Sequence, residues 1–80
     1  MTIRVLAFGI ARDIFQNDFD EVESNSEITV NGLKAILEEK YPRLKLLKSY
    51  MIAVNNVYAN GEQAISTVDE VALIPPVSGG

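Results

Sequence analysis

The chain has 80 residues, enough for one domain with a single small core, and its apolar content of 48% is too high for a disordered chain. It contains neither cysteine nor histidine, which excludes disulfides, thiolate metal sites, thiol nucleophiles and histidine-based acid–base catalysis. Its net charge of −4 argues against nucleic acid as a partner and favours a basic protein surface.

The first predicted strand spans Thr2 to Phe8, where alternate side chains point to opposite faces of a sheet. Its core face carries Ile3, Val5 and Ala7. Arg4 marks the other face as solvent-facing, so Leu6 and Phe8 are expected to be exposed apolar residues there. The apolar run is too short to span a membrane, and no signal-peptide cleavage region follows it, so we expect a cytoplasmic protein with no membrane partner.

Two short elements are predicted between this strand and the main helix. Residues Ala11 to Gln16 form a helical turn with Ile14 and Phe15 directed inward. From Phe19 to Ser24 apolar and charged residues alternate, which is typical of an edge strand whose charges discourage pairing with another chain. Acidic residues gather between Asp13 and Glu27 with no Lys or Arg among them.

The main predicted helix begins after Thr29, a good N-cap, and ends near Tyr41 because Pro42 follows. Its apolar residues recur at helical spacing, at Val30, Leu33, Ile36 and Leu37. Gly32 costs this helix roughly 0.5–1 kcal/mol relative to alanine. Most of the basic residues of the chain lie between Lys34 and Lys48.

Short elements are also predicted after the helix. An irregular turn runs from Arg43 to Ser49, with Leu44 and Leu47 directed inward. Strands are predicted from Met51 to Val54, from Val57 to Ala59 and from Val71 to Ile74. Turns are predicted at Asn55-Asn56 and Asn60-Gly61, and Ile65 is predicted to be a core residue. In the final strand Val71 and Leu73 face the core, which leaves Ala72 and Ile74 on the opposite face. The predicted fold class is α+β, a mixed sheet of about five strands with one main helix packed on one face.

The chain ends in the tail Pro75-Pro76-Val77-Ser78-Gly79-Gly80. The two prolines fix their φ angles near the polyproline value and give a stiff exit from the final strand. Gly79 and Gly80 have no Cβ, so the end is thin enough to enter a narrow tunnel in another protein, where it presents the α-carboxylate of Gly80. We therefore divide the chain into a folded domain of residues 1–74 and a flexible tail of residues 75–80.

Several groups of residues carry a resemblance to a known family. They are Val5-Leu6-Ala7-Phe8 with Arg12-Asp13, the helix start Thr29-Val30 with Leu33, the run Ala53-Val54-Asn55, and above all Asp69-Glu70-Val71-Ala72 running into Ile74 and the Gly-Gly tail. On these residues the chain resembles the MoaD-like sulfur carriers, the small subunits of molybdopterin synthase, which are ubiquitin-like β-grasp proteins. It departs from them before Asp69, where Thr67-Val68 replaces the usual glycine, at Asp13, where glutamate is usual, and at Gly32, where a charged residue is usual.

The resemblance implies a sulfur-donating, non-catalytic subunit of a sulfurtransferase that itself binds neither cofactor nor metal. A ubiquitin-activating-like adenylyltransferase would use ATP to adenylate Gly80, because a carboxylate alone is a poor electrophile. Sulfur would then replace the nucleotide to give a C-terminal thiocarboxylate. In the large synthase subunit, this tail would donate sulfur to cyclic pyranopterin monophosphate during molybdenum cofactor biosynthesis. The implied assembly is a heterotetramer built on a large-subunit dimer.

The resemblance and the strand pattern together predict the site residues. Gly79 and Gly80 carry the sulfur chemistry, and the partner-binding residues are Phe8, Arg12, Tyr58, Ile74, Pro75, Pro76, Val77 and Ser78. Strand parity places Phe8 and Ile74 in an exposed apolar patch at the base of the tail, extended by Tyr58. A patch of this kind on a small protein usually marks an interface.

Three alternatives remain open at this point. A thiamine-type sulfur carrier has the same fold, tail and activation. A ubiquitin-like protein modifier forms isopeptide bonds between Gly80 and lysines of other proteins, which gels reveal as covalent adducts. A plain β-grasp binding module has an inert tail, so deletion of Gly79 and Gly80 leaves its function intact.

Overall fold

The computed structural model describes residues 1–47 and 49–76. The elements follow in the order β1 (Thr2–Ala7), α1 (Ile10–Phe15), β2 (Phe19–Glu23), β3 (Ile28–Thr29), α2 (Val30–Lys40), the 3-10 helix η1 (Pro42–Leu46), β4 (Met51–Val54), β5 (Val57–Tyr58), β6 (Ala64–Ile65) and β7 (Val71–Ile74). No helix within the described residues is long and apolar enough to cross a membrane.

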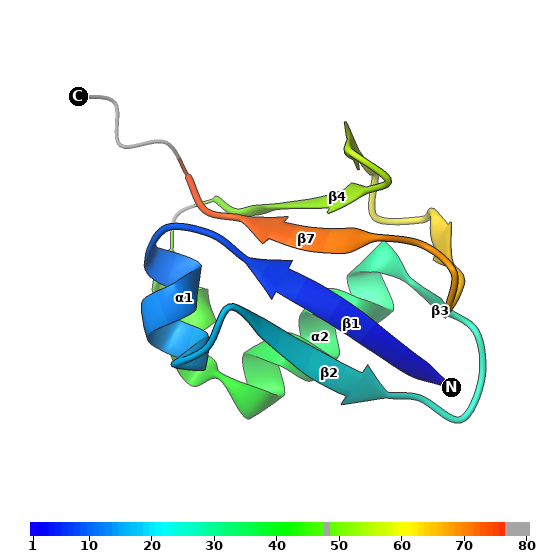
Figure 1. Cartoon of the computed structure of the whole chain (residues 1–80), viewed down its shortest axis with the longest axis horizontal. Helices are drawn as coiled ribbons and strands as arrows, with labels where there is room; N and C mark the ends of the chain where they lie inside the picture. Colours follow the sequence, from blue (N-terminus) through cyan, green and yellow to red (C-terminus); the bar gives the residue numbers. More distant parts are fainter. Residues whose placement is uncertain (48, 77–80) are drawn as a thin grey trace.

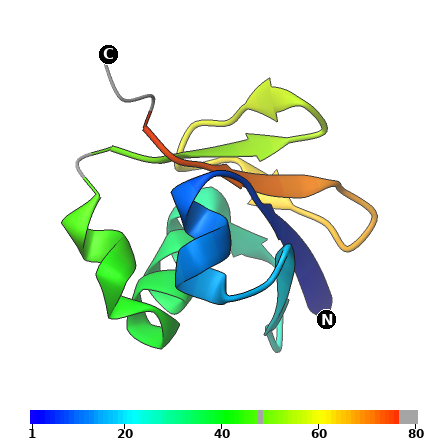
Figure 2. The same cartoon turned by 60° about the vertical axis from the view of Figure 1, so that its left-hand side comes forward.

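Five strands form one mixed sheet in the order β2-β1-β7-β4-β5. The central strands β1 and β7 are parallel, and the other neighbours are antiparallel. Helix α2 packs across one face of this sheet, and α1 lies at the end where the chain leaves β1 (Figures 1 and 2). This is the β-grasp architecture that the sequence predicts.

The core lies between the sheet and α2. Its largest fully buried side chains are Ile3, Leu33, Leu37, Leu44, Ile52, Ile65, Leu73, Val5 and Val71. The predicted parity of the first and last strands is confirmed, since Val5 and Val71 are paired across the sheet and both are completely buried. Burial of a leucine contributes roughly 1.5–3 kcal/mol, so Leu33 and Leu37 together outweigh the cost of Gly32 in the same helix.

Helix α2 begins and ends where the sequence predicts, within one residue. The Thr29 hydroxyl accepts a hydrogen bond from the Gly32 N–H at 3.2 Å and caps the first turn. The helix ends at Lys40 rather than Tyr41 because Tyr41 precedes Pro42 and takes an extended conformation, with φ −129° and ψ 82°.

A second, two-stranded sheet made of β3 and β6 was not predicted. It pairs Ile28 with Ile65 and closes the start of α2, because the Val30 N–H then donates to the carbonyl of Gln63 at 2.9 Å. Ile65 is 1% exposed, which confirms its place in the core. Strands of two residues are too short to produce an alternating pattern, so only the burial of Ile65 could be predicted.

The remaining differences concern the ends of short elements. Strand β1 ends at Ala7 instead of Phe8, β2 ends at Glu23 instead of Ser24, and β5 ends at Tyr58 instead of Ala59. The predicted irregular turn is η1, in which Leu44 is buried, while Leu47 is partly buried against the core. Ile14 and Phe15 of α1 are buried as predicted.

Candidate docking face at the base of the C-terminal tail

The face of the sheet opposite α2 carries small and apolar side chains across its middle. Leu6 of β1 is paired with Ala72 of β7, Ala72 with Ala53 of β4, and Ala53 with Tyr58 of β5. Paired residues in neighbouring strands point to the same side of a sheet. These four side chains therefore form a continuous row, which ends at the exposed ring of Tyr58.

A depression of about 260 Å³ lies along this row. It is lined by Leu6, Phe8, Ala53, Asn56, Tyr58, Glu70, Ala72 and Ile74, which we call the open-face hollow. Phe8 is 49% exposed and Tyr58 is 62% exposed, while Ile74 is half-buried beside them. The predicted grouping of Phe8, Ile74 and Tyr58 on one face is therefore confirmed.

The base of the tail packs against the turn that follows β1. Gly9 has a φ of +56°, which residues with a side chain rarely adopt. A Cβ at Gly9 would lie 3.1 Å from Cγ of Pro75, which is closer than side chains normally approach. The absence of a side chain at position 9 thus lets Pro75 leave β7 directly beside Phe8.

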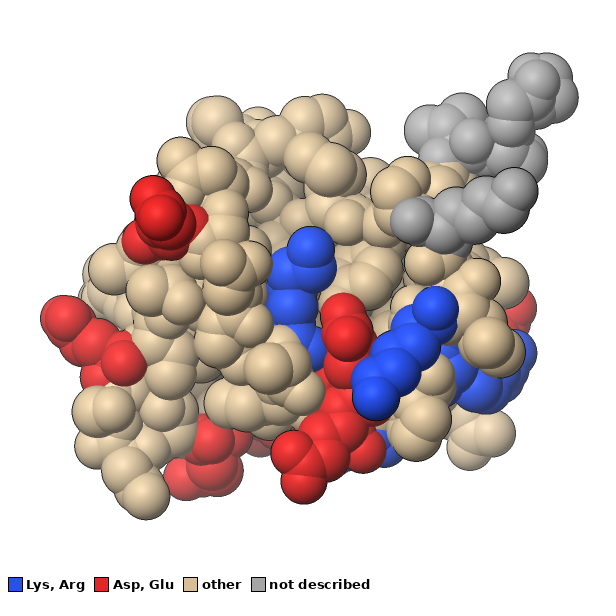
Figure 3. Space-filling view, turned by 180° about the vertical axis from the view of Figure 1, so that it is seen from behind, with Lys and Arg blue, Asp and Glu red and all other residues tan. Residues whose placement is uncertain are grey.

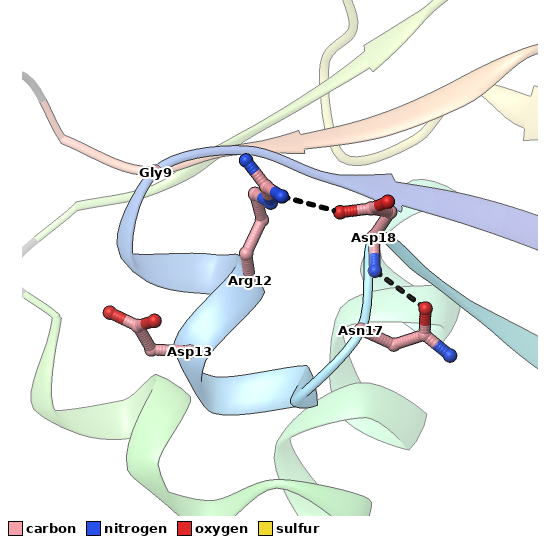
Figure 4. Close-up of a pocket in the computed structure, with 5 residues that line it drawn as sticks. All are labelled: Gly9, Arg12, Asp13, Asn17 and Asp18. Carbon is pink, nitrogen blue, oxygen red and sulfur yellow. Dashed lines mark hydrogen bonds and ion pairs between the residues drawn. The ribbon is translucent and has the colours of Figure 1, made fainter.

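Arg12 lies on α1 next to this face (Figure 4). Its guanidinium forms an ion pair with Asp18 at 2.8 Å, and the Asp18 N–H donates to Oδ1 of Asn17 at 2.7 Å. One hollow of about 290 Å³ is lined by Gly9, Arg12, Asp13, Asn17 and Asp18. A second, of about 370 Å³, is lined by Leu6, Ala7, Phe8, Arg12 and Asp18. Arg12 therefore borders both a polar hollow and the apolar surface of Phe8.

Sequence comparison finds relatives that align with almost the whole chain. The chain is 39% identical to the molybdopterin synthase sulfur carrier subunit of Caenorhabditis briggsae, covering 100% of this chain and 99% of that protein. It is 36% identical to the subunit of the same name from Mycobacterium tuberculosis, covering 98% of this chain and 96% of that one. The ThiS family matches residues 5–80. The chain belongs to the ThiS family.

Solved structures agree with this assignment. A chain in the protein–protein complex of subunits 1 and 2 of the molybdopterin-converting factor from Helicobacter pylori is 30% identical to this ThiS-family chain, with a TM-score of 0.67 and full coverage of both chains. A putative molybdopterin-converting factor subunit 1 from Pyrococcus furiosus superimposes with a TM-score of 0.86 at 22% identity, over 96% of this chain and 99% of that chain, which supports the fold.

Thr67-Val68 occupies the turn before β7, where the resemblance to MoaD-like sulfur carriers predicts a glycine. Neither residue has a positive φ, so no glycine is required there. The Asp69 carboxylate accepts hydrogen bonds from the Ser66 N–H at 2.8 Å and from the Asn55 side-chain amide at 3.0 Å. These bonds hold the pKa of Asp69 below its ordinary value of 3.8. A charged carboxylate thus fixes the turn that leads into the docking face.

The structure adds residues that the sequence prediction did not assign to the site. Ala53 and Ala72 form the floor of the open-face hollow, Asn56 and Glu70 line it, and Asp18 pairs with Arg12. Only the pairing register could have placed the two alanines opposite Leu6 and Tyr58. The predicted site residues Val77, Ser78, Gly79 and Gly80 lie outside the described residues.

Proposed function

We propose that this chain is the sulfur carrier subunit of a molybdopterin synthase. The observation that carries the proposal is the open-face hollow of Phe8, Tyr58 and Ile74, placed where β7 leads into the Gly-Gly tail of a chain 39% identical to such a subunit. The described residues include no group of three His, Cys, Asp or Glu side chains placed to hold a metal ion.

In the proposed cycle, the reactive atom is the carboxylate of Gly80. A ubiquitin-activating-like adenylyltransferase uses ATP to form the acyl-adenylate with release of pyrophosphate. A sulfur nucleophile then displaces AMP and leaves a thiocarboxylate on Gly80. The thiocarboxylate sulfur forms a bond to cyclic pyranopterin monophosphate in the large subunit, and water then cleaves the acyl–sulfur bond, which leaves sulfur on the pterin and restores the carboxylate. We place this cycle in the cytoplasm.

We further propose that the open-face hollow docks both partners. The two proteins must reach the same tail, and Pro75 and Pro76 fix its exit beside Phe8 and Ile74. An apolar side chain of either partner fits between Phe8 and Tyr58, while Arg12 offers a charged contact at the rim. Binding of the large subunit and of the activating enzyme is then mutually exclusive. The assembled synthase is a heterotetramer in which two small subunits flank a large-subunit dimer.

The experiment that tests this proposal extends the tail by one residue after Gly80. The extended protein should bind the large subunit with unchanged affinity but should support no molybdopterin synthesis in a reconstituted assay with activating enzyme, ATP and a sulfur source. Full activity of the untrimmed extended protein would overturn the mechanism. A protein modifier would instead yield covalent adducts on a denaturing gel with the unextended protein.

A further inference from the structure

The basic residues of the structure fall into two sets. Each residue of the first set pairs with an acidic residue that lies in β2 or directly before it. Arg4 pairs with Glu21 at 3.4 Å, Arg12 with Asp18 at 2.8 Å, and Lys40 with Asp20 at 2.8 Å. These ion pairs connect β1, α1 and α2 to the edge strand.

The second set consists of Lys34, Arg43 and Lys45, none of which has an acidic side chain within ion-pairing distance among residues 1–47 and 49–76. They lie on α2 and η1, on the side of the molecule away from the open-face hollow. Figure 3, which views the molecule from that side, shows Lys and Arg side chains gathered on one half of the surface. Asp and Glu side chains lie among them in the same view, so we use the name positive patch only for the three residues Lys34, Arg43 and Lys45.

A depression of about 390 Å³ lies within this positive patch. It is lined by Lys34, Glu38, Leu44, Lys45, Leu47, Ser49 and Tyr50. The Lys34 ammonium lies 4.9 Å from the centre of the Tyr50 ring, which holds it beside the depression. We call this depression the helix-side hollow.

The acidic residue in the helix-side hollow already has a partner. The Tyr50 hydroxyl donates a hydrogen bond to Oε2 of Glu38. Burial raises the pKa of Tyr50, and the hydrogen bond to Glu38 raises it further, so the hydroxyl stays protonated and keeps donating. The Glu38 carboxylate therefore has a hydrogen-bond donor but no ion-pair partner among the described residues, and it faces two lysines in the hollow. Lys34 and Lys45 together exceed its charge and can pair with an incoming acid.

We propose that the helix-side hollow binds an acidic segment of a partner protein that carries one apolar side chain. The apolar side chain would pack against the partly exposed Leu47, and flanking carboxylates would pair with Lys34 and Lys45. A short peptide needs only this local positive potential. A bilayer or nucleic acid would also meet the acidic residues between Asp13 and Glu27, which repel phosphate. This role goes beyond the proposed function, because it uses the other side of the molecule and leaves the tail free.

The test is a titration of the full chain with a blocked synthetic peptide in which aspartates and glutamates flank one leucine, followed by NMR. Backbone amide shifts should change at Lys34, Lys45 and Tyr50. The Lys34→Gln/Lys45→Gln double variant should weaken peptide binding by about tenfold or more, because both charged contacts are lost. The same variant should retain sulfur transfer in the reconstituted synthase assay.

Two matched controls accompany this titration. Gln63→Glu combined with Thr67→Glu changes the net charge by the same amount at exposed positions outside the hollow and should leave peptide affinity within about twofold of wild type. Phe8→Ala should also bind the peptide normally, which separates this proposal from the open-face docking. A peptide with serine in place of leucine should bind more weakly.

Several results would overturn the proposal. They are wild-type affinity in the Lys34→Gln/Lys45→Gln variant, equal affinity for the serine peptide, shifts confined to the open-face hollow, and shifts that depend on protein concentration in the absence of peptide. Binding to phosphatidylserine vesicles without binding to the peptide would assign the patch to a membrane surface instead.

Discussion

The exposure of the Phe8 ring connects the sequence to the proposed function. It follows β1 directly, at a position whose parity points away from the core, and it is 49% exposed. An aromatic ring left in water forgoes the free energy of burial that it would gain in an interface. Because Ile74 and Tyr58 line the same hollow, the exposed ring belongs to a continuous apolar surface suited to a partner.

The first prediction concerns this ring. Phe8→Ala should weaken binding to the large synthase subunit by roughly 1–3 kcal/mol, because the proposed docking places the Phe8 ring at the centre of the contact. Isothermal titration calorimetry measures the loss, and thermal melting verifies that the variant folds. Leu46→Ala is the matched control, since Leu46 is 81% exposed on η1 and its truncation should not change the affinity. Wild-type affinity in folded Phe8→Ala would remove Phe8 from the interface.

At the scale of elements, two adjacent turns hold the strands that form the docking face. Asn55 and Asn56 have φ values of 54° and 69°, as a two-residue hairpin loop between β4 and β5 requires. The Asn55 side chain donates to Asp69 and accepts from the Glu70 N–H at 2.9 Å. The hairpin and the turn before β7 are thereby joined, which aligns Tyr58 with Ala72 across β4.

Asp69 should make the stability of this junction depend on pH. Its pKa is lower in the folded chain than in the unfolded chain, so its contribution is present above about pH 4 and is lost as the pH falls through the folded pKa. Asp69→Asn should therefore lower the free energy of unfolding at neutral pH and have a smaller effect near pH 3. Urea unfolding at both pH values measures this difference. An equal effect at both would contradict the assignment.

Helix α2 offers a second test at this scale. A Cβ at Gly32 would lie 3.5 Å from Cβ of Ile28 and 3.6 Å from the Thr29 hydroxyl, which are ordinary contacts. Gly32→Ala should therefore stabilise the chain by about 0.5–1 kcal/mol. Gly9→Ala is the contrasting variant and should destabilise it, because φ is positive there and Pro75 is too close. Urea unfolding compares the two, and a destabilising Gly32→Ala would show that α2 needs a glycine.

The pattern of apolar residues predicts most elements because each buries one face. Alternation in Thr2–Ala7 and helical spacing in Val30–Lys40 are long enough to show their period. Strands β3 and β6 are too short to show a period. They pair where the chain supplies a hydrogen-bond acceptor for the first turn of α2. The open-face hollow was predictable at Phe8, Ile74 and Tyr58 from parity and the family resemblance. Its alanine floor depends on pairings between distant segments, and the Arg12–Asp18 ion pair depends on the path of the turn between α1 and β2.

At the scale of the whole molecule, the two sides of the sheet differ in chemistry. The open side carries the apolar hollow beside the tail exit, whereas the α2 side carries Lys34, Arg43 and Lys45. In the proposed docking, partners that take the tail approach over Phe8 and Ile74. The proposed peptide site lies on the opposite side, and the proposal predicts that binding there leaves the docking face free.

The central claim is that Gly80 carries sulfur, and the intact mass of the protein tests it most directly. After incubation with the activating enzyme, ATP and a sulfur source, the mass should rise by the difference between one sulfur and one oxygen. Fragmentation should place this change on Gly80, and addition of the large subunit with cyclic pyranopterin monophosphate should reverse it. A mass that stays unchanged under conditions in which molybdopterin is nevertheless formed would contradict the account.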